Sequence, residues 1–164
     1  MEIRAPRPED AEAVGRMHLA SWREAYSPLL PEGFFGDASE QRWVDRWTAN
    51  LADPPEGATS RIALRDGEVV GLASAGPARA NDSAGEPVRD RELWALYVRA
   101  SEYGTGLADR LLAAVLPDGP AELWVFEANP RARTFYARHG FVPDGARHVF
   151  GPDLGDQPEI RMVR

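Results

Sequence analysis

Apolar residues near the start of the chain recur every three or four positions, which is the spacing of amphipathic helices. Pro8, followed by two acidic residues, suits the first turn of one helix, and Pro28 ends that helix. The hydroxyl of Ser39 is expected to cap a second helix, which buries Trp43 and Trp47. The sequence therefore predicts two helices before the first long strands.

The apolar period then changes to two, which indicates strands. Residues 61–73 alternate around Asp66-Gly67, a dipeptide typical of tight hairpin turns, so we expect a β-hairpin there. Glu2–Ala5 reads as a short strand as well. Pro77–Asp90 is small, polar and irregular, and this composition predicts a mobile surface loop.

Strands and helices alternate in the second half of the chain. The predicted elements there are a strand at Leu93–Val98, a helix from Leu107, a strand at Leu123–Phe126, a helix at Pro130–His139, and final strands at Phe141–Pro143 and Pro158–Val163. No repeat or linker interrupts this order, and 164 residues suit one domain. We therefore expect a single α/β domain over residues 1–164.

A glycine-bearing turn joins the strand that ends at Val98 to the helix that starts at Leu107. Unpaired amides and the positive end of the helix dipole favour an anion at such a turn, and glycines let the backbone approach a phosphate. A nucleoside-triphosphate loop needs a lysine, and the chain has none. A dinucleotide fingerprint needs Gly or Ala where Asp109 stands. The turn is therefore expected to hold the phosphates of another ligand.

The segment Tyr103-Gly104-Thr105-Gly106-Leu107-Ala108 resembles the pyrophosphate-binding motif of the GNAT N-acetyltransferase superfamily, Arg/Gln-x-x-Gly-x-Gly/Ala after a strand reading Leu-Tyr-Val. Two positions depart from that motif. Tyr103 stands where the family usually has Arg or Gln, and Ala100 replaces the usual proline after the strand. The departures affect one side-chain contact with phosphate and leave the backbone cradle in place.

A second segment, residues 123–141, also resembles this family. The family pattern runs from a strand through Asn, Ala and an aromatic-Tyr pair to Gly-Phe, and it is matched by Asn129, Ala132, Phe135, Tyr136, Gly140 and Phe141. The resemblance implies an α/β (α+β) fold with a twisted, mostly antiparallel sheet of six to seven strands flanked by about four helices. It also implies that two central parallel strands splay apart and that acetyl-CoA wedges between them.

The resemblance assigns the cofactor contacts to particular positions. The pantetheine and acetyl carbonyl would meet the backbone of Leu96, Tyr97 and Val98, and the pyrophosphate would meet Tyr103, Gly104, Thr105, Gly106, Leu107 and Ala108. Asn129 is expected to cap the next helix, with Pro130 in the first turn, and this role is compatible with a pantetheine contact.

Acetyl transfer to an amine requires that the amine first lose a proton. An alkylamine with a pKa near ~10.4 is so little neutral at pH 7 that deprotonation costs roughly 4 kcal/mol. The resemblance places a general base at Glu92, whose alternative reading is a solvated charge at a strand end, and Glu127 also lies near the cleft. Tyr136 is the expected general acid, and its alternative role is a core aromatic. With no cysteine in the chain, direct attack in a ternary complex is preferred to an acyl-cysteine intermediate.

Residues of the first two helices are candidates for the acceptor side. Trp22 and Tyr26 match a stretch that borders the acceptor cleft in the family, with core packing as the alternative. Trp43 and Trp47 are expected in the core. His18 is expected to be structural, although a place in the acceptor pocket is kept open.

The composition of the chain argues against some classes of ligand and partner. A net charge of −7 argues against nucleic acid, and the absence of cysteine together with three scattered histidines argues against a metal site. No signal peptide or membrane-spanning run is recognised, so we expect a cytoplasmic enzyme. The predicted function is acetyl transfer to a small-molecule primary amine. A protein or peptide N-acetyltransferase and a non-catalytic acyl-CoA-binding domain remain alternatives, and a homodimer is kept as an option.

Overall fold

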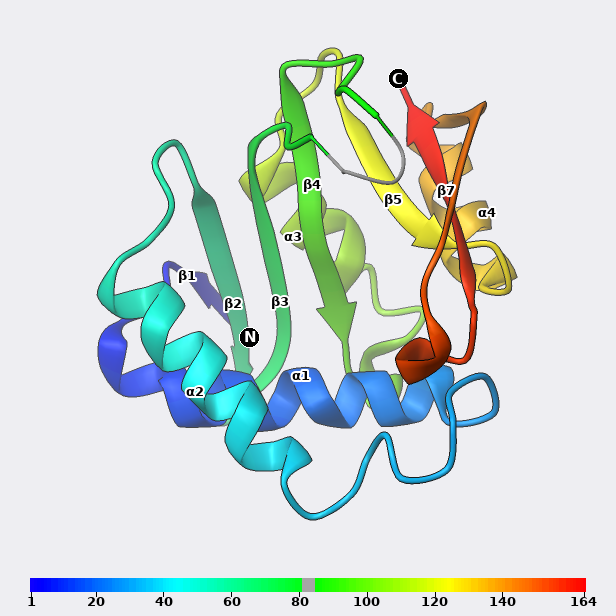
Figure 1. Cartoon of the computed structure of the whole chain (residues 1–164). Coiled ribbons are helices and arrows are strands. Elements are labelled where there is room, and N and C mark those ends of the chain that lie inside the picture. Colours follow the sequence, from blue (N-terminus) through cyan, green and yellow to red (C-terminus); the bar gives the residue numbers. More distant parts are fainter. Residues whose placement is uncertain (81–84) are drawn as a thin grey trace.

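The computed structural model describes residues 1–80 and 85–164, and all of its strands belong to one sheet (Figure 1). The strands are β1 (Glu2–Arg4), β2 (Thr59–Arg65), β3 (Glu68–Pro77), β4 (Arg91–Val98), β5 (Glu122–Phe126), β6 (Val142–Val149) and β7 (Pro158–Val163). The helices are α1 (Ala11–Tyr26), α2 (Ser39–Ala52), α3 (Leu107–Val115) and α4 (Pro130–Arg138), with short 3-10 turns at Pro8–Asp10, Ala100–Glu102 and Pro152–Leu154.

The sheet has seven strands in the order β1-β2-β3-β4-β5-β7-β6, and β4 with β5 is its parallel pair. The other neighbouring strands run antiparallel. Helices α1 and α2 cover one face, and α3 and α4 cover the other (Figure 1). This confirms the mixed, mostly antiparallel α/β fold expected from the sequence.

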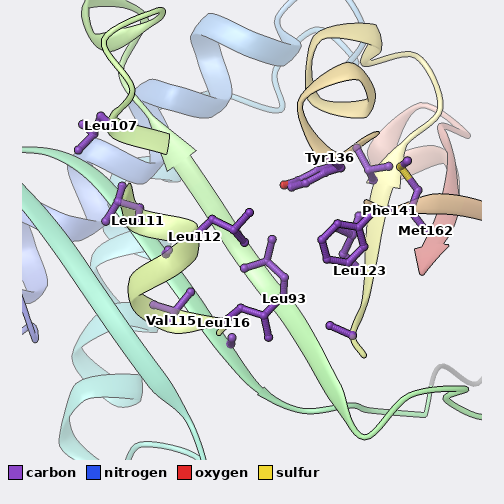
Figure 2. Packing of buried hydrophobic residues seen from close by; sticks show 14 of the residues in the cluster. Leu93, Leu107, Leu111, Leu112, Val115, Leu116, Leu123, Tyr136, Phe141 and Met162 are labelled. Atoms are coloured by element: carbon purple, nitrogen blue, oxygen red, sulfur yellow. The ribbon is translucent and has the colours of Figure 1, made fainter. Parts of the chain in front are cut away.

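The larger core lies on the face covered by α3 and α4. Figure 2 shows leucines of α3 packed against Leu93 of β4, and Leu123 of β5 beside Phe141 and Met162. Leu111 and Phe141 have no exposed surface. Burial of each such side chain contributes about 1.5–3 kcal/mol, so this core holds both strands of the parallel pair to the helices.

The opposite face is held by α1 and α2. Val14 and Met17 of α1 and Trp47 of α2 pack with Ile62 and Leu72 of the sheet. The two helices approach closely at one point, where a Cβ added to Gly15 would lie 2.8 Å from the Cα of Val44. The burial of Trp43 and Trp47 that the sequence predicts is confirmed.

Local predictions had different outcomes. The hairpin turns at Asp66 and Gly67, whose φ angles of 53° and 86° suit a primed two-residue turn. The capping role predicted for Ser39 is wrong. Ala38 occupies the cap position, and the Ser39 hydroxyl instead donates to the carbonyl of Phe34 at 2.9 Å. The reach of this hydroxyl to the preceding loop could not be read from the local sequence.

Two other predictions concern the strand β6 and the loop between β3 and β4. The strand predicted at Phe141–Pro143 runs further, to Val149, because it pairs along β7 across an irregularity in register. Residues 81–84 of the loop predicted at Pro77–Asp90 lie outside the described residues, and the mobility of that loop stays a prediction. At the two ends of the loop, the amide of Ala78 donates to the carbonyl of Asp90 at 3.0 Å.

The parallel pair separates soon after it forms. Strands β4 and β5 pair only where Glu92 and Leu93 meet Glu122 and Leu123. Beyond that point β4 stays paired with β3, whereas its other edge no longer has β5 beside it. The divergence predicted for these two strands is thus present, and it opens the middle of the sheet.

Candidate active site

A cavity of about 760 Å³ lies where β4 and β5 diverge, and it is lined from both faces of the sheet. Most of the residues predicted from the sequence line it, namely Trp22, Tyr26, Leu96, Tyr97, Val98, Tyr103, Gly104, Gly106, Leu107, Ala108, Asn129 and Tyr136. Thr105 and Glu92 are not among the lining residues. One opening in the sheet therefore brings together residues of α1, α3 and α4 with residues of strands β4, β5 and β7.

The strand side of the cavity is formed by the last residues of β4. Leu96, Tyr97 and Val98 pair with β3 on one edge, and the second edge borders the cavity. Backbone donors and acceptors along an unpaired strand edge need partners from outside the sheet. This edge can therefore hydrogen-bond an extended ligand that lies along it.

The glycine turn forms the floor at the start of α3. Gly104 and Gly106 have φ angles of 77° and 79°, a conformation that L side chains adopt only with strain. A Cβ on either residue would meet nothing within 4 Å, so the space beside the turn is open. Within the described part of the chain, the amides of these two glycines have no hydrogen-bond acceptor. The turn presents free donors to an open space, which suits an anion.

Neighbouring contacts hold this turn in place. The Glu102 carboxylate accepts two hydrogen bonds from Arg65, at 2.7 and 2.8 Å, and Arg65 lowers the pKa of that carboxyl. The hydroxyl of Thr105 donates to the carbonyl of Glu102 at 2.8 Å. Thr105 therefore supports the turn from within, and it is not among the residues that line the cavity.

Positive charge reaches the turn from α4. The guanidinium of Arg131 lies 3.6 Å from the centre of the Tyr103 ring, and Arg131 and Arg138 both line the cavity. Neither arginine has a carboxylate partner among the described residues. The first-turn acid Asp109, by contrast, is 3.0 Å from Nε2 of His139. The two arginines were missed from the sequence, because nothing local in it shows that α4 faces the glycine turn.

Tyr136 enters the cavity from α4. Figure 2 shows its hydroxyl turned away from α4 toward β4. The side chain is buried, and burial raises the pKa of its hydroxyl far above the ordinary value, with a smaller contribution from Tyr26. The hydroxyl of Tyr136 therefore keeps its proton over the whole neutral range.

Asn129 joins the two sides of the cavity. Its side-chain oxygen accepts from the amide of Ala132 at 3.0 Å, which confirms that it caps α4. Its side-chain nitrogen donates to the hydroxyl of Tyr26 at 3.3 Å. Burial raises the pKa of Tyr26, and this hydrogen bond opposes the rise. One residue thereby links the end of α1 to the start of α4.

Aromatic rings cover the α1 side. Tyr26 packs edge-on to Trp22 and to Phe126, with ring centres 5.1 and 4.9 Å apart. Phe150 packs on Phe126 from the far side, at 5.7 Å. These rings make an apolar wall at one end of the cavity.

The predicted base Glu92 is buried outside this lining. Its carboxylate accepts from the backbone amide and from Nη2 of Arg79, both at 3.0 Å. The alternative, Glu127, lies 3.2 Å from Nε of Arg147 and does not line the cavity. The base role of Glu92 stays a prediction. To take a proton from an amine, its carboxylate would first have to break the ion pair with Arg79.

A carboxylate missed from the sequence lines the cavity instead. Glu159 of β7 lies on the same face as its cross-strand neighbour Phe126. Burial, and secondarily the charge of Glu92, raise its pKa to about 7. The sequence held one sign of this residue. Glu159 precedes the apolar residues Ile160 and Met162, which share one face of β7, so its charge belongs to the opposite face of the sheet.

His18 is buried among aromatic side chains of α1, α2 and β4, and its structural role stays a prediction. Its Nδ1 accepts from Nε1 of Trp47 at 3.1 Å, and the Trp43 ring lies 4.2 Å away. Burial lowers the pKa of His18 well below its usual value, and Arg46 adds to this. The histidine lines a second cavity of about 730 Å³, which shares Trp22 and Tyr97 with the first.

Comparison with known proteins identifies the family of this chain. Residues 19–141 match the Acetyltransferase (GNAT) family. The chain belongs to the GNAT family. The sequence led us to expect a GNAT fold in which the parallel strands β4 and β5 diverge and a glycine turn follows β4. The protein is an N-acetyltransferase.

Relatives of this GNAT protein span nearly its whole length. An uncharacterised N-acetyltransferase of Mycobacterium tuberculosis is 35% identical over 94% of this chain and 97% of its own. An aminoglycoside N(6')-acetyltransferase type 1 of Stenotrophomonas maltophilia is 33% identical over 98% of this chain and 89% of its own. The PaiA N-acetyltransferase of Thermoplasma acidophilum, solved in complex with coenzyme A, shares the fold at a TM-score of 0.68 and 16% identity, covering 98% of this chain and 96% of its own.

No cluster of three or more metal-ligating side chains occurs in residues 1–80 and 85–164. Over the same residues, no helix has the length and apolar character needed to cross a membrane.

Proposed function

We propose that this GNAT protein transfers the acetyl group of acetyl-CoA to a primary amine of a small molecule, by direct attack in a ternary complex. The observation that carries the proposal is the opening between β4 and β5, bordered by a free strand edge and by the free amides of the glycine turn. A relative named as an aminoglycoside acetyltransferase supports a small-molecule acceptor. We also propose that residues 1–164 act as one domain.

The residues around the opening fit coenzyme A. The edge of β4 at Leu96 to Val98 would hold the pantetheine amides, because it offers backbone donors and acceptors without a neighbouring strand. The amides of Gly104 and Gly106 would hold the pyrophosphate, since they are unpaired and the space beside them is open. Arg131, stacked on Tyr103, would supply the side-chain charge that the motif lacks at position 103.

Bound there, acetyl-CoA would supply the acetyl thioester, and groups of the protein would stabilise the negative charge that forms on its oxygen and sulfur during the transfer. The backbone amide of Val98 is the proposed hydrogen-bond donor to the carbonyl oxygen as negative charge develops on it. The hydroxyl of Tyr136 is the proposed donor to the leaving sulfur. Its raised pKa keeps the proton in place until sulfur becomes negative, and a thiol with a pKa near ~8.5 leaves readily with such help.

The acceptor would enter from the α1 face, because α3 and α4 occupy the other side of the opening (Figure 1). Trp22 and Tyr26 are the proposed substrate contacts on that face. The apolar wall made by Tyr26, Phe126 and Phe150 would keep the approaching amine away from bulk water.

Two measurements test the proposal. Calorimetric titration with acetyl-CoA should show binding, and an assay of thiol release over amines, aminoglycosides, amino acids and short peptides should show turnover with a small amine. Turnover only with peptides would favour the protein or peptide N-acetyltransferase. Binding without turnover on any amine would favour the non-catalytic acyl-CoA-binding domain. No binding would refute both the enzyme and the acyl-CoA-binding domain.

A further inference from the structure

The acceptor side of the cavity holds one carboxylate that no other described residue neutralises. Glu159 lines the cavity, whereas the two other acids considered for catalysis, Glu92 and Glu127, are paired with arginines and do not line it. Within residues 1–80 and 85–164, the Glu159 side chain makes no hydrogen bond or ion pair. A half-buried carboxylate left without a partner is costly unless something cationic approaches it.

Strand alternation sets the direction of this side chain. Ile160 and Met162 pack into the core beneath α3 and α4, so Glu159 must face the α1 side. Its neighbour across the strands, Phe126, packs on Tyr26 of α1, which agrees with that direction. Glu159 therefore lies on the face from which the amine would enter.

The charged and titratable groups around Glu159 come from four elements. On β7 itself, Arg161 faces the same way, but its Nε is 2.7 Å from a carboxylate oxygen of Asp144. On β6, His148 is the cross-strand partner. On β4, Glu92 contributes negative charge while it is held by Arg79. On α1, the titratable group on the cavity wall is the hydroxyl of Tyr26, which stays neutral because its pKa is raised.

We propose that Glu159 is the general base of the reaction: it receives the acceptor ammonium and takes the proton that must leave before attack. This inference rests on the proposed function. The neutral amine nitrogen then forms a bond to the acetyl carbon while the carbon–sulfur bond breaks. Of the two protons lost by nitrogen, one passes through Glu159 to solvent and the other ends on the coenzyme sulfur. Atoms and charge balance with an acyl thioester as the only co-reactant.

The ionisation of Glu159 suits this role. A base works best when its pKa lies close to the working pH, and burial with the charge of Glu92 raises the pKa of Glu159 to about 7. Glu92 then acts as a positioning residue, because its negative charge raises the pKa of Glu159 and its side chain does not touch the amine.

A titration without any ligand tests the first half of the inference. The protein is labelled with glutamate carrying ¹³C at the side-chain carboxyl, and its spectra are followed from pH 4 to 9 beside those of Glu159→Gln. The resonance that is missing in the variant should titrate near pH 7. A missing resonance that titrates in the ordinary range of glutamate, near ~4.3, would overturn the proposal.

A pH–rate profile tests the second half, using the panel amine with the highest turnover. The wild-type kcat/KM should rise tenfold per pH unit up to about 7 and then stay level to the amine's own pKa, near ~10.4. Without the base, only the free amine reacts. The profile of Glu159→Gln should therefore lose the break at 7 and keep rising to the amine's pKa, with a rate at pH 7 lower by about 10²- to 10⁴-fold.

Two variants separate Glu159 from the alternatives. Glu92→Gln should move the break to lower pH and keep it, because the variant removes only a neighbouring charge. Loss of the break in Glu92→Gln, with its survival in Glu159→Gln, would transfer the base role to Glu92. Glu68→Gln, at an exposed position of β3, makes the same charge change and should leave the profile unaltered.

Acetyl-CoA titrations of the same proteins distinguish the two levels of the proposal. Glu159→Gln should bind acetyl-CoA as the wild type does. If the wild type fails to bind acetyl-CoA, the proposed function fails, whatever the labelled carboxyl does. If it binds and turns over but the break survives in Glu159→Gln, only the role of Glu159 fails.

Discussion

The guanidinium of Arg131 lies over the ring of Tyr103, 3.6 Å from its centre, and both residues border the glycine turn at the start of α3. Tyr103 occupies the position where the GNAT motif usually carries Arg or Gln. The aromatic face holds a cation from α4 at the place where the motif would have supplied one from its own segment. The departure in the motif is thus accompanied by a specific contact from another element.

Arg131→Ala should weaken binding of coenzyme A about tenfold, because a cation stacked beside the phosphate cradle is removed. Calorimetry with coenzyme A measures the change. Acetyl-pantetheine, which lacks the phosphates, should bind both proteins equally. Arg16→Ala, on the outer surface of α1, provides a control for loss of charge alone. Equal loss of affinity for both ligands would show that Arg131 acts on the fold and not on phosphate.

Gly106→Ala should lower the free energy of unfolding by roughly 1–2 kcal/mol, since an L side chain at φ 79° is strained even though the space is open. Chemical denaturation measures this loss, and affinity for coenzyme A should fall as the turn relaxes. Gly151→Ala is the matched control, because Gly151 has a φ of −73° and equally open surroundings. Similar destabilisation in both variants would contradict the explanation from backbone strain.

Tyr136→Phe should reduce kcat by about 10²-fold or more while acetyl-CoA affinity stays within a factor of a few. The ring is retained, so the core contacts of Tyr136 with Phe141 remain. Burial raises the pKa of Tyr136, and no break from this hydroxyl is therefore expected between pH 6 and 9. Steady-state rates and calorimetry check both parts. An unchanged kcat would remove Tyr136 from the reaction and leave it as a core residue.

Gly15→Ala should destabilise the protein by roughly 1–3 kcal/mol, because the new Cβ would meet the backbone of Val44 at 2.8 Å. Helix propensity alone predicts the opposite, a gain of about 1 kcal/mol from replacing glycine inside a helix. The sign of the change in chemical denaturation therefore separates the two effects. Stabilisation would mean that α1 and α2 can move apart freely at this contact.

Sequence reasoning located the two segments that line the cavity, but it missed some of the charged residues there. The glycine turn and the segment from Asn129 to Tyr136 could be recognised because their spacing is local, and both line the same cavity. Arg131 lies within one of these segments, yet its partner Tyr103 belongs to the other. Nothing in either segment alone indicates that the two side chains stack.

The acceptor side was harder to predict. Trp22 and Tyr26 line the cavity as expected, whereas Glu92 turns out to be held by Arg79. Glu159 lies 67 positions further along and reaches the site only because β7 pairs with β5. Pairing of strands distant in sequence depends on packing across the whole sheet, and local patterns do not encode it.

By itself, the sequence determined the order of the elements, the hairpin at Asp66-Gly67, the glycine turn and the family. These depend on short-range periodicity, turn chemistry and residue spacing, all of which are written within a few adjacent positions. The tertiary structure decided which carboxylates are paired, which one has no partner among the described residues, and which arginine reaches the glycine turn. Those outcomes depend on burial and charge contributed by strands and helices that are remote in the chain, and only the folded arrangement brings them to within a few ångströms of each other.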